Sequence, residues 1–346
     1  MVALFSPGHA LIVGVGADLP NTIDDAVGVA SVLNDPSRCA YPPEQVHLLT
    51  GEQANRTSIL TSLDTLAQTT NAESTVVVYF SGHGYLTQSP LGSIYFLMPH
   101  GYDVTQLYTT AISGSELATK LAAIKAQKLV VLLDCCHAGG VGDAKAPGLS
   151  LTKSPLPPEA LPLLAQGSGK VLIASSREDE LSYAGKPYSA FTLAIIEALC
   201  GVGVAKQDGY VRVADVALHA REWVPRRTGE KQHPVLHFEH ADNFVLAYYA
   251  GGDAQPKGLP FQMDAVQIEP VPGAWTLSGE FDGPVAAGGG DAIDLRDSQG
   301  AIVNPSGRVK QYNVRIRNAR GMAIGDNAQV HIYGAQEQGT EDEDTA

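Results

Sequence analysis

Two stretches of this sequence place a cysteine or a histidine, together with glycines, directly after an apolar run. Residues 129–140 read LVVLLDCCHAGG and contain Cys135 and Cys136, and residues 75–84 read TVVVYFSGHG and contain His83 between two glycines. A thiol beside an imidazole is the minimal nucleophile–base pair for covalent catalysis. The residue types therefore predict thiol chemistry, provided that the fold brings the two stretches together.

The elements that position these residues follow from the hydrophobic pattern. Uninterrupted apolar runs are typical of buried strands in a parallel sheet, because such strands are covered on both faces. Strands are predicted at 10–15, 45–49, 75–80, 129–133, 171–174 and 234–238, and helices at 24–33, 56–67, 114–125, 189–199 and 213–224. This alternation indicates right-handed parallel crossovers, whose strands end at one shared edge. Ligands bind at that edge, so we expect His83 and the two cysteines to meet there.

Composition limits the classes of partner. The chain has 346 residues, 44% of them hydrophobic, and a formal net charge of -14. An acidic balance argues against nucleic-acid or anionic-membrane partners. The four cysteines include an adjacent pair and suggest no disulfide framework, and we see neither a membrane span nor a secretory signal. We therefore expect a cytoplasmic protein.

The motifs resemble those of the caspase-like cysteine peptidases, within them the metacaspase and bacterial caspase branch. The similarity covers about residues 10–248, and the matching pieces are residues 10–15 with Asp24-Asp25-Ala26, Tyr79 to Gly84, Asp134 to Gly140, residues 171–176 and the helix around Phe191. The resemblance implies an α/β three-layer sandwich with a mostly parallel six-stranded sheet. It also implies a cysteine endopeptidase that works through an acyl-enzyme.

Roles for individual residues come from the family pattern Asp-any-Cys-His-Ser/Ala-Gly. Laid on this chain, the pattern makes Cys136 the nucleophile, with His83 as its base. In the resembling family, the backbone amides at the positions of Gly84 and Cys136 form the oxyanion hole. Side chains alternate along a strand, so Cys135 should point into the core as a small buried hydrophobe. We interpret His137 as structural, because a neighbour in sequence points away from the nucleophile.

The alternative chemistry for this cluster is a metal site. Cys135, Cys136, His137 and His83 are all zinc-ligand types, but the spacing lacks the usual gap between chelating residues, so we expect no metal. Many metacaspases carry an acidic calcium-binding stretch after the histidine motif. Residues 85–98 contain no Asp or Glu, and calcium requires several oxygen ligands, so we expect neither calcium dependence through that site nor any other cofactor.

The acidic residues near the candidate site predict which substrate side chains the protein prefers. The acidic positions of the metacaspase pocket map onto Asp25 and Asp134, with Ser81 beside them. Two carboxylates at one site suit the Arg or Lys side chain of a protein or peptide substrate. The alternative role for Asp25 is that of an acid at a helix N-terminus, where the helix dipole favours it. Asp24 takes its place if the helix register differs by one residue.

The chain is predicted to contain a peptidase domain, an accessory module and a tail. The peptidase domain spans 1–251, with a large-subunit region at 1–140, an exposed excursion at 141–169 and a small-subunit region at 170–251. A β-rich module follows at 252–336, and an acidic, disordered tail at 337–346. Lys145, Lys153 and Lys170 in or next to the excursion are candidate sites of activating cleavage, by the enzyme itself or by an upstream protease. An ordinary uncleaved loop is an equal alternative.

The function predicted from these observations is a zymogen-type cysteine endopeptidase that cleaves after Arg or Lys. Resemblance to the bacterial branch adds a role in defence or stress signalling. The rival hypothesis is a latent or non-catalytic caspase-like scaffold that assembles through its C-terminal module. That module is interpreted either as a plain small β domain or as a self-association segment.

Overall fold

The layers of this molecule follow from the alternation of side chains along its central strands. In the computed structural model, Val77 and Tyr79 of strand β3 (Thr75–Ser89) face one hydrophobic core, whereas Val76, Val78 and Phe80 face another. Strand β1 (Gly8–Gly14) and strand β6 (Lys128–Cys136) alternate between the same two cores. Each strand is thus buried on both faces, as its uninterrupted apolar run requires.

The central sheet has the strand order β12-β9-β6-β3-β1-β2. Strands β2 (Val46–Thr50), β1, β3, β6 and β9 (Lys170–Ala174) run parallel, and β12 (Val235–His237) pairs antiparallel with β9. The predicted six-stranded, mostly parallel sheet is confirmed. The far end of β3 continues the sheet through an antiparallel pairing with β4 (Gly92–Met98).

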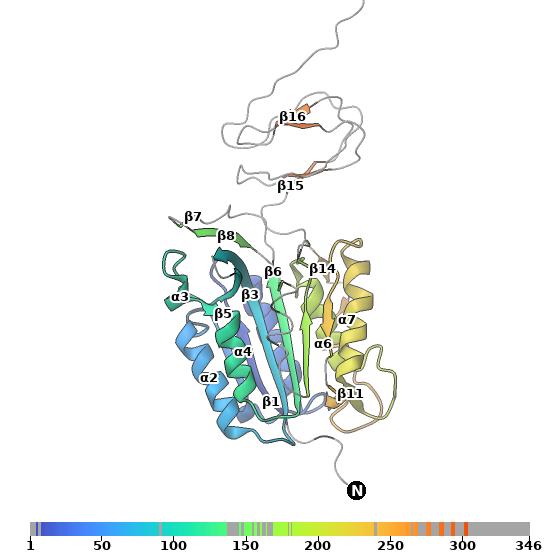
Figure 1. The fold of residues 1–346 in the computed structure, drawn as a ribbon. Helices are drawn as coiled ribbons and strands as arrows, with labels where there is room; N and C mark the ends of the chain where they lie inside the picture. The colour runs from blue at the N-terminus through green and yellow to red at the C-terminus, as the bar shows by residue number, and fades with distance from the viewer. Residues whose placement is uncertain are drawn as a thin grey trace, which may run out of the picture. The chain divides into compact units, whose positions relative to one another are not determined.

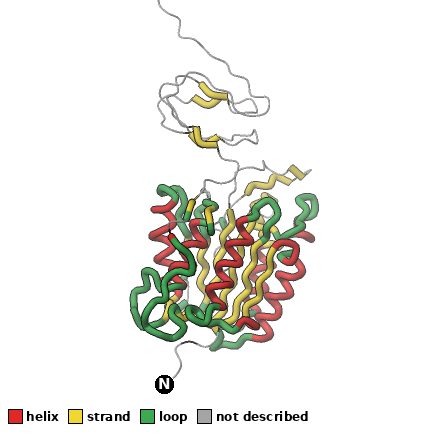
Figure 2. The backbone as a smooth tube through the Cα atoms, turned by 180° about the vertical axis from the view of Figure 1, so that it is seen from behind, coloured by secondary structure: helices red, strands yellow, loops and turns green. Residues whose placement is uncertain are grey.

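Helices cover both faces of the sheet (Figure 1), and the view from behind shows the same layers (Figure 2). Helices α1 (Asn21–Asn34), α6 (Ala190–Leu199) and α7 (Val213–Arg227) contribute to the core that contains Val77. Helices α2 (Arg56–Thr69) and α4 (Gly114–Ala123) contribute to the opposite core. This arrangement confirms the three-layer sandwich.

Helix α1 begins at Asn21 rather than at Asp24, so Thr22 lies within its first turn. The Thr22 hydroxyl does not cap the helix. It accepts a hydrogen bond from the Gly16 amide (2.8 Å) and donates one to the Leu19 carbonyl (2.8 Å), which ties the preceding turn to the helix.

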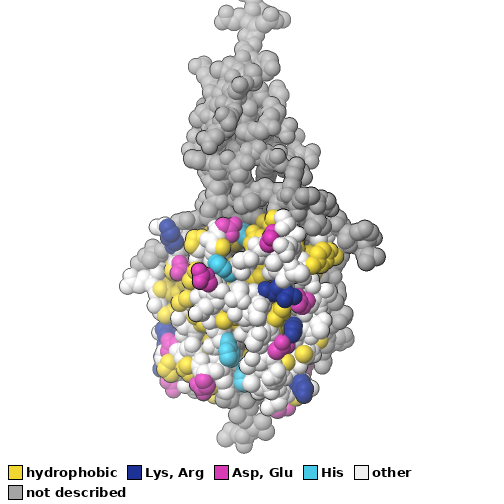
Figure 3. Space-filling model, turned by 90° about the vertical axis from the view of Figure 1, so that its left-hand side faces the viewer, with side chains coloured by type: hydrophobic (Ala, Val, Ile, Leu, Met, Phe, Trp, Pro, Cys, Tyr) yellow, Lys and Arg dark blue, Asp and Glu magenta, His cyan; other side chains and the backbone are white. Residues whose placement is uncertain are grey.

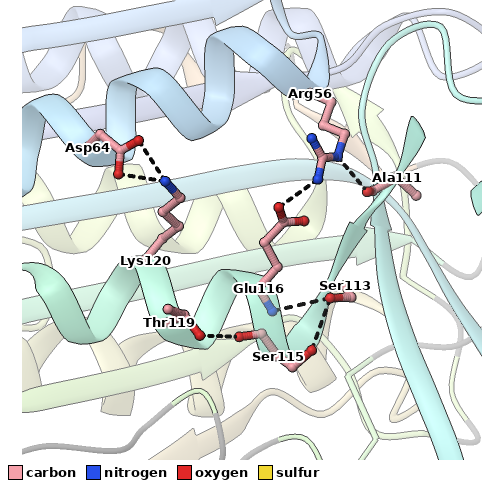
Figure 4. Close-up of polar contacts among 8 residues, drawn as sticks. All are labelled: Arg56, Asp64, Ala111, Ser113, Ser115, Glu116, Thr119 and Lys120. Atoms are coloured by element: carbon pink, nitrogen blue, oxygen red, sulfur yellow. Dashed lines mark hydrogen bonds and ion pairs between the residues drawn. The ribbon is translucent and has the colours of Figure 1, made fainter. Parts of the chain in front are cut away.

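Ion pairs join the two outer helices α2 and α4 (Figure 4). The Lys120 ammonium contacts both Asp64 oxygens at 2.7 and 2.6 Å, and the Arg56 guanidinium contacts Glu116 at 2.6 Å. Basic and acidic side chains are also interspersed over the face drawn in Figure 3. Such partly exposed pairs contribute about 0–1 kcal/mol each, so the buried apolar contacts hold these helices in place.

The structure describes residues 5, 8–89, 92–136, 145–146, 149–153, 156–157, 160, 164, 169–178, 180, 182–238, 241–263 and 266–268, with four short strands beyond them. The smaller elements are α3 (Leu107–Thr110), β5 (Ile112–Ser113), β7 (Lys145–Ala146), β8 (Leu149–Lys153), β10 (Gly185–Lys186), β11 (Tyr210–Arg212), β13 (Val245–Tyr248), β14 (Gln267–Ile268) and two 3₁₀ turns (Pro43–Gln45, Gly51–Gln53). No helix in these ranges is long and apolar enough to cross a bilayer.

The excursion at 141–169 is not uniformly exposed. Leu156, Ala160 and Leu164 are buried in the core that α2 and α4 share. The expectation of an exposed segment is wrong for these three residues, because their apolar side chains find room against the sheet. The strands β7 and β8 pair with each other, and β8 also pairs with β3.

The chain divides into two compact units, residues 1–138 with 143–272, and residues 139–142 with 273–346. The first unit continues past the expected boundary at 251: β14 pairs with β10, and the rings of Tyr188 and Phe261 lie 5.5 Å apart. In the second unit, β15 (Trp275–Leu277) pairs with β18 (Ala301–Val303), and β16 (Pro284–Ala286) with β17 (Ala292–Asp294). The predicted tail at 337–346 lies outside the described residues.

Candidate active site

The parallel pairing of β3 with β6 ends at His83 and Cys136, so the two chemistry-bearing stretches lie side by side, although β3 itself continues to Ser89 rather than ending at residue 80 as predicted. Strands β3 and β6 pair in parallel, and their register sets His83 opposite Cys136 and Ser81 opposite Asp134. Paired residues on neighbouring strands lie about 5 Å apart with their side chains on the same face. The sheet therefore brings the histidine and cysteine motifs together, as their positions after apolar runs predict.

The alternation of side chains separates the two cysteines. Cys135 is buried in the core on the α2 and α4 face, whereas Asp134 is hydrogen-bonded to residues of the α6 region on the opposite face. Period two then puts position 136 on the Asp134 face, although the Cys136 side chain itself lies outside the described residues.

Cys135 behaves as a structural residue. Burial raises the pKa of its thiol to about 12, so the thiol stays protonated and is a poor nucleophile at neutral pH. The prediction that Cys135 is a small buried hydrophobe is therefore confirmed. His137 lies outside the described residues.

His83 is buried, and its ring is held on one side. The Nε2 atom lies 2.8 Å from a carboxylate oxygen of Asp18, in the turn between β1 and α1. The Nδ1 atom is buried and has no hydrogen-bond partner among the described residues. Sequence reasoning did not single out Asp18, although it lies in the turn after β1 (Gly8–Gly14), at the edge of the sheet where ligands bind.

The Asp134 carboxylate is saturated with hydroxyl donors. It accepts hydrogen bonds from Ser182 at 3.0 Å, Ser189 at 2.6 Å and Thr192 at 3.3 Å. Burial raises the pKa of Asp134, and these hydroxyls counteract the rise by stabilising the charged form. The three donors were also missed; Ser189 could have been suspected, since it precedes the apolar pattern of α6 and caps it through the Thr192 amide at 3.0 Å.

Asp25 is bound less completely. One carboxylate oxygen accepts a hydrogen bond from the Ser189 amide at 2.8 Å, and the other has no hydrogen-bond partner among the described residues. Burial raises the pKa of Asp25 well above 3.8, and the nearby charge of Asp134 raises it further. Asp24 is exposed, so the helix register places Asp25 at the sheet rather than its neighbour.

The Ser81 hydroxyl completes this buried polar group. Ser81 lies close enough to Asp25 to lower the pKa of that carboxyl, but it makes no hydrogen bond of ordinary geometry to a described residue. The fold thus gathers Asp25, Asp134 and Ser81, the three residues expected to read the substrate. The unused oxygen of Asp25 and the Ser81 hydroxyl are suited to a cationic, hydrogen-bonding group.

Other predicted positions are less constrained. Gly84 follows His83 in β3 and pairs with Leu97 of β4, so its oxyanion-hole role remains a prediction. Lys153 ends β8, Lys145 begins β7, and Lys170 is buried at the start of β9. Within the described ranges, no group of three or more His, Cys, Asp or Glu residues could hold a metal ion.

A helix-covered parallel sheet that sets a histidine opposite a cysteine where two of its strands stop pairing defines an α/β protein with a candidate cysteine–histidine site. A comparison with protein families identifies it further: the family described as "Caspase domain" matches residues 7–245. The chain therefore belongs to the caspase-domain family, which consists of cysteine peptidases.

Other comparisons add little. No curated protein matched the sequence. Among solved structures, the chain is similar to protein GSU0716 from Geobacter sulfurreducens, with 16% sequence identity and a TM-score of 0.44. That alignment covers 67% of this chain and 93% of the other.

Proposed function

We propose that this protein is a cysteine endopeptidase that cleaves peptide bonds after Arg or Lys, with Cys136 as nucleophile and His83 as base. The observation that carries the proposal is the strand register, which sets His83 opposite Cys136 beside the buried carboxylates. The thiol proton passes to His83, and the thiolate attacks the carbonyl carbon. The protonated amine then leaves, and water hydrolyses the thioester.

The preference for basic residues rests on Asp25. Its second oxygen is buried without a partner in the described regions of the chain, and a second carboxylate, Asp134, lies close enough to raise its pKa. A guanidinium or ammonium group between these carboxylates would relieve that repulsion and supply the missing donor. An acidic substrate side chain would add a third negative charge instead.

Peptides with a fluorogenic group after Arg, Lys or Asp test the proposal. We expect cleavage after Arg and Lys, complete loss in Cys136→Ala, and retained activity in the matched control Cys135→Ala. Cleavage only after Asp would overturn the acidic pocket. No cleavage by either the intact protein or one cut within 141–169 would favour the scaffold.

Activating cleavage is proposed at Lys153. From His83 onward, one edge of β3 pairs with β4, and the other edge pairs with β6 only as far as Cys136. Strand β8 pairs with β3 beyond that point, with Lys153 opposite Tyr85, so it must lie on the edge that β6 no longer covers. Lys153 therefore lies two ladder positions from the His83–Cys136 pair. Lys170, by contrast, is buried at the start of β9, which lies between β6 and β12, so a protease must first open the middle of the sheet.

This choice can be tested by mass spectrometry of the purified protein. We expect wild type and Lys145→Gln to yield two fragments, and Lys153→Gln and Cys136→Ala to stay intact. Cleavage of Cys136→Ala by added wild type would show that the cut also occurs between molecules. An intact wild type that is already active would remove the zymogen idea.

A further inference from the structure

The turn between β1 and α1 carries an acid that contacts the candidate base. The Asp18 carboxylate lies 2.8 Å from Nε2 of His83, whose side chain is 2% exposed, whereas the Asp18 side chain is 47% exposed. We propose that Asp18 is the positioning residue of a Cys136–His83–Asp18 triad. This inference rests on the proposed function, because it takes His83 to serve Cys136.

The turn that presents Asp18 is rigidly held. The Leu19 amide bonds to the Gly16 carbonyl at 3.0 Å, and the buried Thr22 hydroxyl links Gly16 and Leu19 from inside α1. Ala17 adopts a positive φ of 57°, a conformation that L-residues other than Asn and Asp seldom use. Backbone strain of this kind persists only where the surroundings enforce it, and it occurs most often at functional sites.

The contact decides which ring nitrogen is basic. A carboxylate only accepts hydrogen bonds, so Nε2 must carry the proton that points at Asp18. In the neutral ring the lone pair is then on Nδ1, the buried atom without a partner among the described residues. Nδ1 is thus free to accept the Cys136 thiol proton, which gives a thiolate and an imidazolium, and to pass that proton to the leaving amine. Asp18 stays ionised and keeps its hydrogen bond to Nε2–H throughout.

The neighbours of His83 fix its orientation. The Tyr85 ring packs edge-on against the imidazole, with ring centroids 6.2 Å apart. Burial, and in addition the charge of Asp18, raises the pKa of the phenols of Tyr85 and Tyr102, so both stay neutral. Asp18 is therefore the negative group that faces the imidazolium as it forms, and it should stabilise that state more than the neutral ring.

Because Asp18 is half-exposed, its effect on turnover can be distinguished from its effect on the stability of the fold. An ion pair with one exposed partner contributes little to folding, so Asp18→Asn should lower the melting temperature by no more than about 2–4 °C. In a triad, loss of the orienting carboxylate lowers turnover by about 10- to 10⁴-fold while leaving substrate contacts intact.

The test compares Asp18→Asn, Asp18→Glu and the control Asp242→Asn, in which an exposed acid loses the same charge. Three quantities are measured: kcat and KM on an Arg peptide, the rate of Cys136 alkylation by iodoacetamide mapped by mass spectrometry, and the ¹⁵N shifts of the His83 ring. For Asp18→Asn we expect kcat to fall at least about tenfold, KM to change less than about threefold, and alkylation to slow about tenfold. The ring shifts should show loss of the Nε2–H form.

Asp18→Glu should restore some of each loss, and Asp242→Asn should match wild type. Unchanged kcat, alkylation and ring shifts in Asp18→Asn would overturn the triad. The alkylation and ring measurements need no substrate. If wild type cleaves no peptide but Asp18→Asn still alters both, then the proposed function fails and the positioning role stands.

Discussion

The two buried carboxylates, Asp25 and Asp134, differ in how many of their oxygen atoms are hydrogen-bonded. Three hydroxyls bind Asp134, whereas one oxygen of Asp25 has no partner in the described structure. A carboxylate whose oxygens all accept hydrogen bonds holds its neighbouring side chains in place. A buried carboxylate oxygen that accepts none can still bind a donor from a ligand. We therefore propose that Asp25 is the main group that recognises the substrate charge, and that Asp134 supports it.

This difference predicts a trade between stability and activity at Asp25. Burial and the Asp134 charge raise its pKa above 3.8 in the folded state. The folded state therefore binds the Asp25 proton more tightly than the unfolded state does. The free energy of unfolding falls as the pH rises from about the pKa of Asp25 in the unfolded chain through its raised pKa in the folded protein. At pH 7, Asp25→Asn should raise the melting temperature by about 2–4 °C while it abolishes cleavage after Arg.

Thermal unfolding between pH 4 and pH 8, with peptide assays at the upper end, checks this prediction. The gain in melting temperature should shrink toward pH 4, because Asp25 itself becomes protonated there. Asp24→Asn removes the same charge one residue away at an exposed position and should change neither quantity. A less stable Asp25→Asn at pH 7 would show that the carboxylate is held by contacts outside the described residues.

The start of helix α6 links the sheet to the candidate pocket. Ser189 caps the helix through the Thr192 amide, and its hydroxyl and amide bind Asp134 and Asp25. Ser189 therefore holds the start of α6 against the end of β6 and binds the carboxylates of both Asp25 and Asp134. The helix could be predicted from its apolar spacing, but the double role of its cap depends on contacts between distant segments.

Two cap variants measure that double role. Ser113→Ala removes the corresponding cap of α4, which accepts from the Glu116 amide at 3.2 Å, and should cost about 1 kcal/mol. Ser189→Ala also leaves the charged Asp134 without its closest donor and should cost about 2–3 kcal/mol. Only Ser189→Ala should raise KM for Arg peptides. Equal costs in denaturant unfolding would mean that the Asp134 contact adds nothing to stability.

The structural unit that contains the candidate site extends beyond residue 251. Residues up to Pro272 belong to the unit that contains the site, through the β10–β14 pairing and the Tyr188–Phe261 contact. A chain ended at 251 therefore loses core contacts, whereas one ended at 272 keeps them. We expect the shorter form to melt at a lower temperature and the longer one to match the full chain.

Light scattering of the full chain and the 1–272 form tests the proposed self-association of the C-terminal module. A lower mass per particle in the truncated form, beyond the residues removed, would support it. The same mass ratio as the sequence lengths would favour a plain β domain. Peptide cleavage by the 1–272 form should equal that of the full chain in either case, because the site lies in the first unit.

The sequence by itself determined the sheet, the layers and the pairing of His83 with Cys136. Those features depend on local patterns, the apolar runs and the period of two along each strand, and on the rule that parallel strands end at one edge. The period of two also separated Cys135 from Cys136. Resemblance to a family supplied the candidate substrate-binding residues Asp25, Asp134 and Ser81, which the structure gathers together.

Only the tertiary structure decided which further residues complete the site. Asp18 reaches His83 across 65 positions of sequence, and Ser189 reaches Asp134 across 55. No local pattern encodes such contacts, because they depend on how a turn and a helix end are placed over neighbouring strands. Packing also decided that Leu156, Ala160 and Leu164 are buried, and that the first unit continues to Pro272. Burial depends on the surface that another segment offers, and that surface exists only in the folded chain.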